Sequence, residues 1–347
     1  MEWAIIPRQA VKVKMLTWQC RTANYHFKLT SMQIIVTGGA GFLGQRLAKA
    51  LLDSRLQFDK LLLVDIIMPQ NTISDERMEC RQVDLSAHGA AASIVQSDTS
   101  IIFHLAAVVS SHAEKEFETG WRVNLDITRN LLEACRHNRP GIRFVFSSSL
   151  AVFGGELPPI VNDSTAVTPM SSYGTQKAIG ELLVNDYSRK GFVDGITLRL
   201  PTICVRPGRP NLAASSFVSS IIREPLRGEE AICPVSAKLP LFLSSPATVV
   251  SNLIHAAIIS TDTLGWRTLN LPGITVTVEA MLDALRRIAD ESTAARVRFE
   301  ANESINRIVS TWPGAIDNSR AIELGFFTDE NFDNFIFQHI ADNKQLA

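Results

Sequence analysis

The chain of 347 residues has little of what marks a disulfide-bonded, metal-binding or membrane-spanning protein. Its five cysteines are odd in number and widely scattered, without a Cys-x-x-Cys pair, so we expect neither a disulfide framework nor a metal site. No apolar run approaches the roughly 20 residues that cross a bilayer. Together these absences favour the reducing cytoplasm.

An excess of charge of either sign is also missing. Lysine and arginine number 34 against 35 aspartates and glutamates, which gives a formal net charge of −1. This composition provides no general basic surface for nucleic acid or a membrane. Because 46% of the residues are apolar, the chain can bury a substantial core, and we expect a globular protein.

The first 31 residues differ from the rest of the chain. They carry five basic side chains and one acid, a balance that resembles an organelle-targeting segment. A start of translation at Met32, just before the first apolar run, explains the same composition. We interpret residues 1–31 as a disordered or non-native extension and leave them out of the fold prediction.

From Met32 onward, short apolar runs alternate with amphipathic segments, which predicts parallel strands joined by helices on both faces of a sheet. The predicted strands are Gln33–Val36, Leu61–Asp65, Met78–Asp84, Ile101–Leu105, Ile142–Ser148 and Gly195–Leu200, and the predicted helices are 42–52, 121–136 and 173–190. After Pro201 the alternation becomes irregular and rich in proline. We therefore predict an α/β fold with a doubly wound parallel sheet over residues 32–200. Residues 201–347 should form mainly a smaller C-terminal substrate-binding lobe, with some elements returning to the first.

A glycine-rich segment, Thr37-Gly38-Gly39-Ala40-Gly41-Phe42-Leu43-Gly44, joins the first predicted strand to the first helix. Residues without Cβ permit a tight turn and let a pyrophosphate approach the backbone, while the helix N-terminus supplies amide donors and positive potential. Asp65, at the end of the second strand, can accept hydrogen bonds from both adenosine ribose hydroxyls and repels a 2′-phosphate. The pattern predicts a Rossmann-type domain that binds NAD rather than NADP. Its predicted contacts here are Gly38, Gly41, Phe42, Leu43, Gly44 and Asp65.

Three more positions agree with a bound dinucleotide. Asp84 and Leu85 follow the third strand, where a carboxylate could meet the adenine amino group, although Asp84 could equally cap the next helix. Ala106 follows the fourth strand and is small enough for the backbone to pass under the cofactor, but packing alone would also explain it.

The catalytic prediction starts from Tyr173 and Lys177, which lie one helical turn apart on the same face. A free tyrosine titrates near 10, and a neighbouring Lys⁺ together with an oxidised nicotinamide would lower its pKa toward neutrality. Lys177 could also bond the nicotinamide ribose. Ser147-Ser148-Ser149 closes the fifth strand at the sheet edge where such folds bind ligands, so one hydroxyl there could align the reacting alcohol with the phenol.

The order of TGGAGFLG, Asp65, HLAA (104–107), SSSLAVFG (147–154), YGTQK (173–177) and LRLP (198–201) resembles the extended short-chain dehydrogenase/reductase superfamily. The resemblance extends over essentially all of residues 32–347. It implies that Ser149 is the catalytic serine, with Ser148 as the alternative, and that both contact the substrate. It also implies that Asn124 braces the active site, although a helix-surface amide is an equal interpretation, and that Pro201 and Thr202 lie at the cofactor.

The superfamily contains epimerases, dehydratases and dehydrogenases. Its nucleotide-sugar epimerases usually carry an asparagine after the sixth strand, and a later arginine with paired acids that grip a diphosphate. Here Thr202 occupies the first position, and residues 239–246 lack the arginine and the acids. Arg206, Arg209 or Arg223 could meet phosphate instead.

Two segments, PTICVRPGRPN (201–211) and IIREPL (221–226), resemble the D-erythronate dehydrogenase branch of the superfamily. That branch implies NAD-dependent oxidation of a small sugar acid at C2 to a 2-oxo acid. A carboxylate substrate needs a cationic clamp, and arginine suits planar bidentate recognition. We predict Arg209 with Asn211 as the clamp and Ser215 as a further substrate contact.

Two other functions stay open on the sequence alone. A nucleotide-sugar 4-epimerase of the UDP-hexose type would keep tightly bound NAD, and an NAD-binding protein without turnover would only bind the cofactor. The resemblance also implies a homodimer formed by two helices of each subunit.

Overall fold

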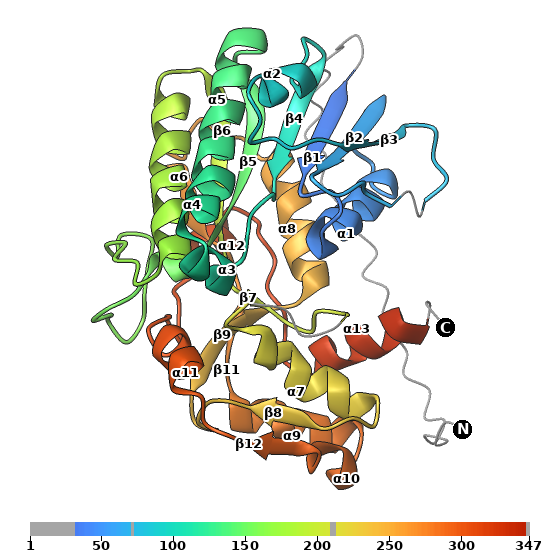
Figure 1. The fold of residues 1–347 in the computed structure, drawn as a ribbon, viewed down its shortest axis with the longest axis vertical. Helices are drawn as coiled ribbons and strands as arrows, with labels where there is room; N and C mark the ends of the chain where they lie inside the picture. Colours follow the sequence, from blue (N-terminus) through green and yellow to red (C-terminus); the bar gives the residue numbers. More distant parts are fainter. Residues whose placement is uncertain (1–31, 71–72, 209–212, 345–347) are drawn as a thin grey trace. The chain divides into compact units, whose positions relative to one another are not determined.

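The computed structural model describes residues 32–70, 73–208 and 213–344, and Figure 1 shows their arrangement. The predictions for residues 1–31, Arg209 and Asn211 fall outside the described residues. Within the described part, no helix has both the length and the apolar character needed to cross a bilayer.

A seven-stranded sheet organises the larger lobe, with strand order β10-β6-β5-β4-β1-β2-β3 and every neighbouring pair parallel. Its strands are β1 (Gln33–Thr37), β2 (Lys60–Asp65), β3 (Met78–Gln82), β4 (Thr99–His104), β5 (Ile142–Ser149), β6 (Val193–Leu200) and β10 (Thr268–Asn270). The predicted doubly wound α/β fold is confirmed. The strand order reverses between β1 and β4, the point at which such sheets open a crevice for ligands.

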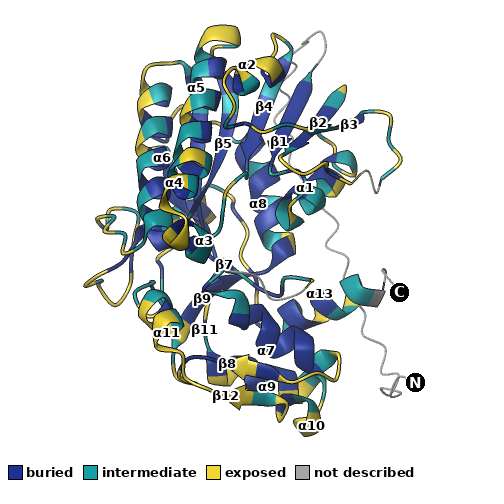
Figure 2. Ribbon diagram, viewed as in Figure 1, coloured by how far each residue is buried: buried dark blue, intermediate teal, exposed yellow. Residues whose placement is uncertain are grey.

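Alternate residues of each strand pack against helices on opposite faces of the sheet, and Figure 2 shows both faces buried. Leu61 and Leu63 of β2 lie in the cluster under α1 (Phe42–Leu52) and α8 (Pro246–Ile258). Leu62 and Val64 lie in the other cluster. Its helices are α2 (Ala90–Ile94), α5 (Ile127–Asn138) and α6 (Ser172–Arg189). The apolar runs without alternation arise because both faces are covered.

The helical region before α5 differs from the single helix predicted over 121–136. The chain forms α3 (Ser110–Lys115), α4 (Phe117–Gly120) and then a π-helix, η1 (Trp121–Asp126), before α5. Asn124 in η1 bonds Val108 and Gln176, which lie on other segments. Such bonds to other segments favour the wider turn of a π-helix, and π-helical turns are frequent at functional sites. Hydrophobic periodicity does not reveal them.

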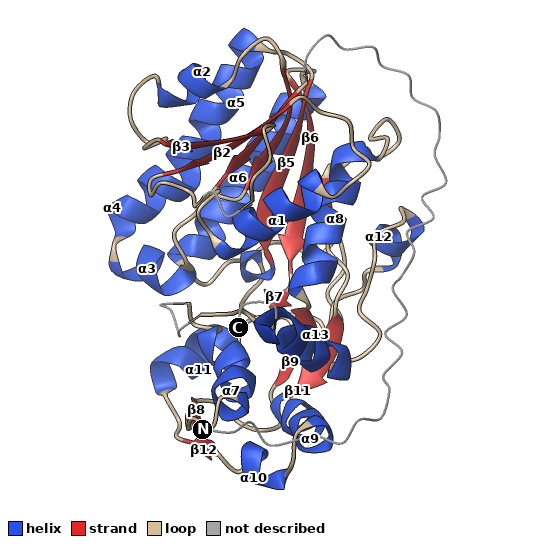
Figure 3. Ribbon diagram, turned by 90° about the vertical axis from the view of Figure 1, so that its right-hand side faces the viewer, coloured by secondary structure: helices blue, strands red, loops and turns tan. Residues whose placement is uncertain are grey.

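The smaller lobe is built from two short sheets and the helices around them (Figure 3). The strands are β7 (Thr202–Ile203), β9 (Pro240–Ser244) and β11 (Ile274–Thr277) in one sheet, and β8 (Ala231–Cys233) and β12 (Val297–Phe299) in the other. The helices are α7 (Ser216–Leu226), α9 (Val278–Ile288), α10 (Glu291–Ala294), α11 (Glu303–Val309) and α13 (Asp333–Lys344). Between them, the chain returns to the larger lobe with α8, β10 and α12 (Ser319–Glu323).

Two neighbouring leucines of β2 test whether both faces of the sheet carry a packed core. Leu62 and Leu63 are fully buried in different clusters. Leu62→Ala and Leu63→Ala should each lower the free energy of unfolding by about 2–5 kcal/mol, the usual cost of a buried cavity. Urea denaturation measures both. A loss well under about 1 kcal/mol in either variant would mean that its face of the sheet is not packed as described.

Candidate active site

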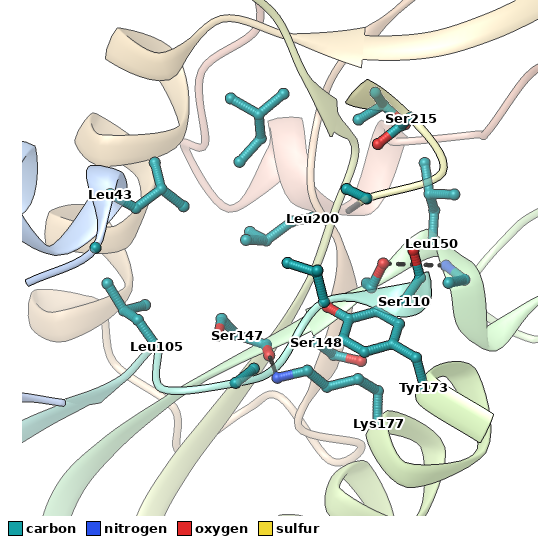
Figure 4. Close-up of a pocket in the computed structure, with 18 of the residues that line it drawn as sticks. Leu43, Leu105, Ser110, Ser147, Ser148, Leu150, Tyr173, Lys177, Leu200 and Ser215 are labelled. Carbon is teal, nitrogen blue, oxygen red and sulfur yellow. Dashed lines mark hydrogen bonds between the residues drawn. The ribbon is translucent and has the colours of Figure 1, made fainter. Parts of the chain in front are cut away.

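A cleft of about 310 Å³ lies at the carboxyl ends of the parallel strands, where α1, the segment after β4 and the end of β5 meet residues of the smaller lobe. Figure 4 shows its inside: Leu43 and Leu105 lie on one side, Ser215 on the opposite side, and Tyr173 and Lys177 project from α6 between them. The cleft therefore contains most of the residues that the sequence patterns single out.

The glycine-rich segment fits a pyrophosphate by its backbone geometry. Gly38 has φ +74°, and a Cβ there would stand 2.8 Å from the backbone nitrogen of Ala106. A Cβ on Gly44 would stand 2.2 Å from the carbonyl oxygen of Gly38. No side chain caps α1 at Gly41, and the first turn of the helix lines the cleft. An uncapped helix N-terminus approached by residues without Cβ is the arrangement that binds phosphate groups.

Asp65 ends β2 beside this loop, as predicted. Its carboxylate accepts hydrogen bonds from the backbone nitrogens of Ala40, at 3.0 Å, and Ile67, at 3.3 Å. These bonds orient the carboxylate next to the glycine loop and leave it further acceptor capacity for a ribose.

Asp84 and Leu85 make local contacts in the structure. Asp84 accepts hydrogen bonds from the backbone nitrogen and the hydroxyl of Ser86, and these bonds lower the pKa of its carboxyl. Leu85 packs into the core between the sheet, α2 and α5. Asp84 therefore closes a local turn with Ser86 and does not cap α2, whose N-cap residue is Gly89. Its adenine contact stays a prediction.

Asn124 is buried and lies behind the cleft. Its side-chain oxygen accepts from the backbone nitrogen of Val108 at 2.8 Å, and its nitrogen donates to the carbonyl of Val108 and to Oε1 of Gln176. It thus ties the segment after β4 to α6. These bonds agree with the bracing interpretation, and a direct cofactor contact by Asn124 stays a prediction.

The remaining predicted cofactor positions lie at the edge of the cleft. Thr202 lines it, together with Leu200 and Ile203. The backbone nitrogen of Ala106 donates to the hydroxyl of Thr37 at 3.3 Å, so this small residue holds the β4 loop against the glycine turn. Pro201 is buried and lies between two residues that line the cleft.

The structure brings Ser149, Tyr173 and Lys177 together. Ser149 and Tyr173 both line the cleft, and the Ser149 hydroxyl acts to lower the pKa of Tyr173. Lys177 is buried and donates from Nζ to the carbonyl oxygen of Ser147 at 2.8 Å, and this nitrogen lies 5.8 Å from the centre of the Tyr173 ring. The helix that carries both residues begins at a cap, in which the hydroxyl of Ser171 accepts from the backbone nitrogen of Gly174.

Ser148 is directed elsewhere. Its hydroxyl donates to Oε1 of Glu181 at 2.5 Å, inside the protein. Successive side chains of a strand point to opposite sides, so Ser148 turns toward α6 while Ser149 faces Tyr173. Ser148 still lines the cleft, but its hydroxyl is engaged by Glu181, and its substrate contact stays a prediction.

The electrostatics of Tyr173 differ from the expectation in one respect. Burial raises the pKa of Tyr173 to about 12, while the hydrogen bond from Ser149 and the charge of Arg206 act to lower it. Lys177, expected to be the cation that acts on the phenol, lies against the ring and bonds a carbonyl. Burial also lowers the pKa of Lys177 to about 7, against the opposing effect of Glu181.

Arg206 is the main functional candidate that the sequence prediction passed over in favour of Arg209. It lies between β7 and α7, lines the cleft, and donates to the hydroxyl of Ser215 at 3.2 Å. Its carbonyl oxygen accepts from the buried Arg223 at 2.6 Å, and its backbone nitrogen donates to Ser219. Its place in the sequence could have indicated it. Arg206 is the first arginine after Thr202, so its backbone lies nearer to the sheet edge along the chain than that of Arg209.

Ser110 and Trp312 also line the cleft, and neither was predicted to do so. Trp312 packs against the core of the smaller lobe and also lines the cleft. The described residues that line the cleft include two basic side chains, Lys177 and Arg206, and no carboxylate. No group of three or more His, Cys, Asp or Glu in the described part could hold a metal ion.

A sequence model of the NAD dependent epimerase/dehydratase family matches residues 34–241. The chain belongs to this family. The resemblance to extended short-chain dehydrogenases/reductases is thereby confirmed, and the family implies a nicotinamide cofactor, for which the uncapped helix and Asp65 provide a fitting site.

Similar proteins of the NAD dependent epimerase/dehydratase family carry two kinds of name. A D-erythronate dehydrogenase of Haemophilus influenzae is 55% identical over 89% of this chain and 99% of its own length. A D-erythronate dehydrogenase of Cupriavidus necator is 49% identical over 90% of this chain and 98% of its own. A solved structure described as a nucleoside-diphosphate-sugar epimerase of Agrobacterium tumefaciens has a TM-score of 0.86 and 41% identity. The match covers 94% of this chain and 98% of the Agrobacterium tumefaciens chain.

Two glycines of the loop should separate a structural role from a binding role. Gly44→Ala places a Cβ against the Gly38 carbonyl and should lower the free energy of unfolding by about 1–3 kcal/mol. At Gly41, φ is −73° and a Cβ would stand 3.1 Å from the same oxygen, so Gly41→Ala should change stability by less than about 1 kcal/mol. Its added methyl group should instead weaken NAD binding roughly tenfold or more.

Calorimetry of the free protein and NAD titration measure the two effects. Unchanged NAD affinity in Gly41→Ala would remove the glycine loop from the proposed pyrophosphate site.

Proposed function

We propose that this chain is an NAD-dependent dehydrogenase that oxidises a small sugar acid of the D-erythronate type at C2 to its 2-oxo acid. The observation that carries the proposal is Arg206, which lies beside Tyr173 in a cleft whose described lining holds no carboxylate. Such a cleft favours an anionic substrate. The names of the two relatives that are 55% and 49% identical support the same substrate class.

The carboxylate of the substrate would bind Arg206. A guanidinium offers parallel donors that match a carboxylate in a bidentate pair. Because Arg206 acts on the pKa of Tyr173 through its charge, the anchor for the carboxylate is close to the phenol. An acid held there presents its neighbouring carbon, rather than a distant one, to the catalytic residues. Ser110 and Ser215 provide further hydroxyls in the cleft for the remaining alcohol groups.

Ser149 and Tyr173 would handle the proton of the reacting hydroxyl. Ser149 holds the substrate oxygen, and Tyr173 as phenolate takes the proton from it. A pKa of about 12 leaves little phenolate at neutral pH, so each positive charge and donor that lowers this pKa increases the active fraction. Lys177 holds its place by its bond to Ser147 and adds positive charge when protonated. When bound, NAD supplies the acceptor for the substrate's hydride and a further positive charge.

Asp65 supports NAD over NADP as the cofactor. Its carboxylate is held beside the glycine loop by two backbone bonds, where it would accept from ribose hydroxyls and repel a 2′-phosphate. The segment Ile66-Ile67-Met68 that follows carries no cation that would neutralise such a phosphate.

A nucleotide-sugar epimerase is the second candidate, favoured by the description of the 41% identical structure. A diphosphate brings two negative charges at a distance from the reacting sugar, and needs a second cationic group. Of the two other arginines considered for phosphate, Arg223 is buried in an ion pair with Glu224, and Arg209 lies outside the described residues. The described cleft therefore suits a single carboxylate better than a diphosphate.

Formation of NADH distinguishes the two candidates directly. Purified protein with NAD should show rising absorbance of NADH in the presence of D-erythronate and related four-carbon 2-hydroxy acids. UDP-hexoses should give none, and should not be epimerised. Conversion of a UDP-hexose to its 4-epimer without net NADH, together with no turnover of sugar acids, would replace the proposal by the second candidate.

Tyr173→Phe should lower kcat roughly 10²–10⁴-fold, because the phenol that takes the proton is removed. NAD binding, followed by titration, should stay close to the wild-type value. Tyr187→Phe on the same helix provides the matched control, since Tyr187 bonds Glu133 away from the cleft. Near-normal turnover in Tyr173→Phe would exclude Tyr173 as the base.

Arg206→Gln should raise the KM for the sugar acid roughly 10- to 100-fold, the usual effect of losing a hydrogen bond to a charged group. Because the charge of Arg206 lowers the pKa of Tyr173, its loss should also shift the acid limb of the kcat/KM profile to higher pH, by about one unit. Arg209→Gln is the comparison variant. If Arg209→Gln raises KM and Arg206→Gln does not, the clamp is at Arg209, as the sequence alone suggested.

A further inference from the structure

We propose that Glu181 is a positioning residue of the active site, whose carboxylate keeps the proton on Lys177 and anchors the strand that carries Ser149. The inference deepens the proposed function and rests on its assignment of Ser149, Tyr173 and Lys177. Glu181 itself lies outside the cleft and contacts no substrate.

Glu181 is a buried carboxylate one helical turn beyond Lys177 on α6, and only 2% of it is exposed. Arg199 of β6 donates to it from Nη2 at 2.8 Å and from Nε at 3.0 and 3.2 Å. Ser148 of β5 donates to it at 2.5 Å. One carboxylate therefore joins α6 to two strands of the sheet. Burying an unpaired carboxylate costs free energy because the charge loses its water, and these hydrogen bonds offset that cost.

The bond to Ser148 sets the orientation of the neighbouring serines. With the Ser148 side chain held toward α6, the alternation of the strand turns Ser149 toward Tyr173. The carbonyl of Ser147 accepts from Lys177, and the Ser147 hydroxyl donates to the carbonyl of His104 at 2.9 Å. The end of β5 is thus fixed by bonds of both Ser147 and Ser148.

The charge of Glu181 acts on Lys177 across the same short stretch of helix. Burial alone disfavours the protonated lysine, and Glu181 opposes it. The Ser147 carbonyl, which accepts from Nζ, and the Phe146 ring, whose centre lies 4.8 Å from Nζ, also contact the ammonium group, but the other titratable groups around Lys177 add no negative charge. His104 of β4 is kept neutral by burial, which lowers its pKa to about 3, and Tyr173 is protonated at neutral pH. Arg206, which also lines the cleft, carries positive charge and gives Lys177 no such support.

Arg199 of β6 pairs with Glu181 and weakens its effect on Lys177. The Lys177 pKa is about 7, so a modest change in this balance decides whether the lysine is charged at neutral pH. The buried Arg199–Glu181 pair therefore controls a charge that the proposed mechanism uses.

Two substitutions should move the pKa of Lys177 in opposite directions. Glu181→Gln removes the negative charge, so the Lys177 pKa should fall by about one unit or more. Arg199→Gln leaves the carboxylate without its arginine, so the Lys177 pKa should rise, but by less than it falls in Glu181→Gln, because Glu181 is the charge that acts on Lys177 directly. Loosened packing alone would shift the Lys177 pKa in the same direction in both variants, so it would not produce shifts of opposite sign.

Carbon-13 NMR of the free protein, labelled at lysine Cε, measures this pKa directly. The Lys177 signal is the one missing from the spectrum of Lys177→Met. Because neither NAD nor a sugar acid is present, a wrong substrate assignment does not affect the result. Shifts of the same sign in both variants, or no shift in either, would overturn the electrostatic part of the proposal.

Two further variants complete the test. If Glu181→Gln fails to fold, Glu181→Gln with Arg199→Gln removes both charges without leaving one unpaired, and its Lys177 pKa should lie below the wild-type value. An unchanged or raised value there would overturn the proposal. Ser148→Ala keeps both charges and should leave the Lys177 pKa unchanged, but it should lower kcat roughly ten- to hundredfold through misplacement of Ser149. Wild-type kcat in Ser148→Ala would overturn the anchoring role.

Discussion

The uniform direction of the seven strands is the constraint on which the site depends. Because every pair in the large sheet is parallel, the residues that follow the strands all meet at one edge. The glycine turn after β1, Asp65 at the end of β2 and Ser149 at the end of β5 come together there although they are far apart in the chain. Parallel strands require helical crossovers, and the start of one crossover, α6, brings Tyr173 and Lys177 to the same edge.

Burial has a strong effect on the protonation of the titratable groups at this edge of the sheet. It raises the pKa of Tyr173 and lowers that of Lys177, so both groups are pushed toward their neutral forms. The surrounding charges oppose this effect: Arg206 acts on the tyrosine and Glu181 on the lysine. Each of the two is in turn held by a further arginine, Arg223 through a backbone carbonyl and Arg199 through an ion pair.

The smaller lobe supplies one wall of the cleft. The larger lobe holds the features shared by dinucleotide-binding sheets, whereas Arg206, Ser215 and Trp312 enter the cleft from the chain beyond β6. A substrate carboxylate bound by Arg206 would place a negative charge close to the phenol. The same residue would then link recognition of the acid with the protonation state of the base.

The sequence by itself determined six of the seven strands of the large sheet and its glycine-rich loop, but not β10. These features depend on local patterns: apolar runs of strand length, glycines at a tight turn, and Tyr173 four residues before Lys177. Only the tertiary structure showed that the hydroxyl of Ser148 bonds Glu181, whereas Ser149 acts on Tyr173. It also brought Arg206 into the cleft and showed Asn124 as a brace, and it broke the expected helix at η1. These features arise from contacts between segments that are distant in the chain, and hydrophobic periodicity carries no information about such contacts.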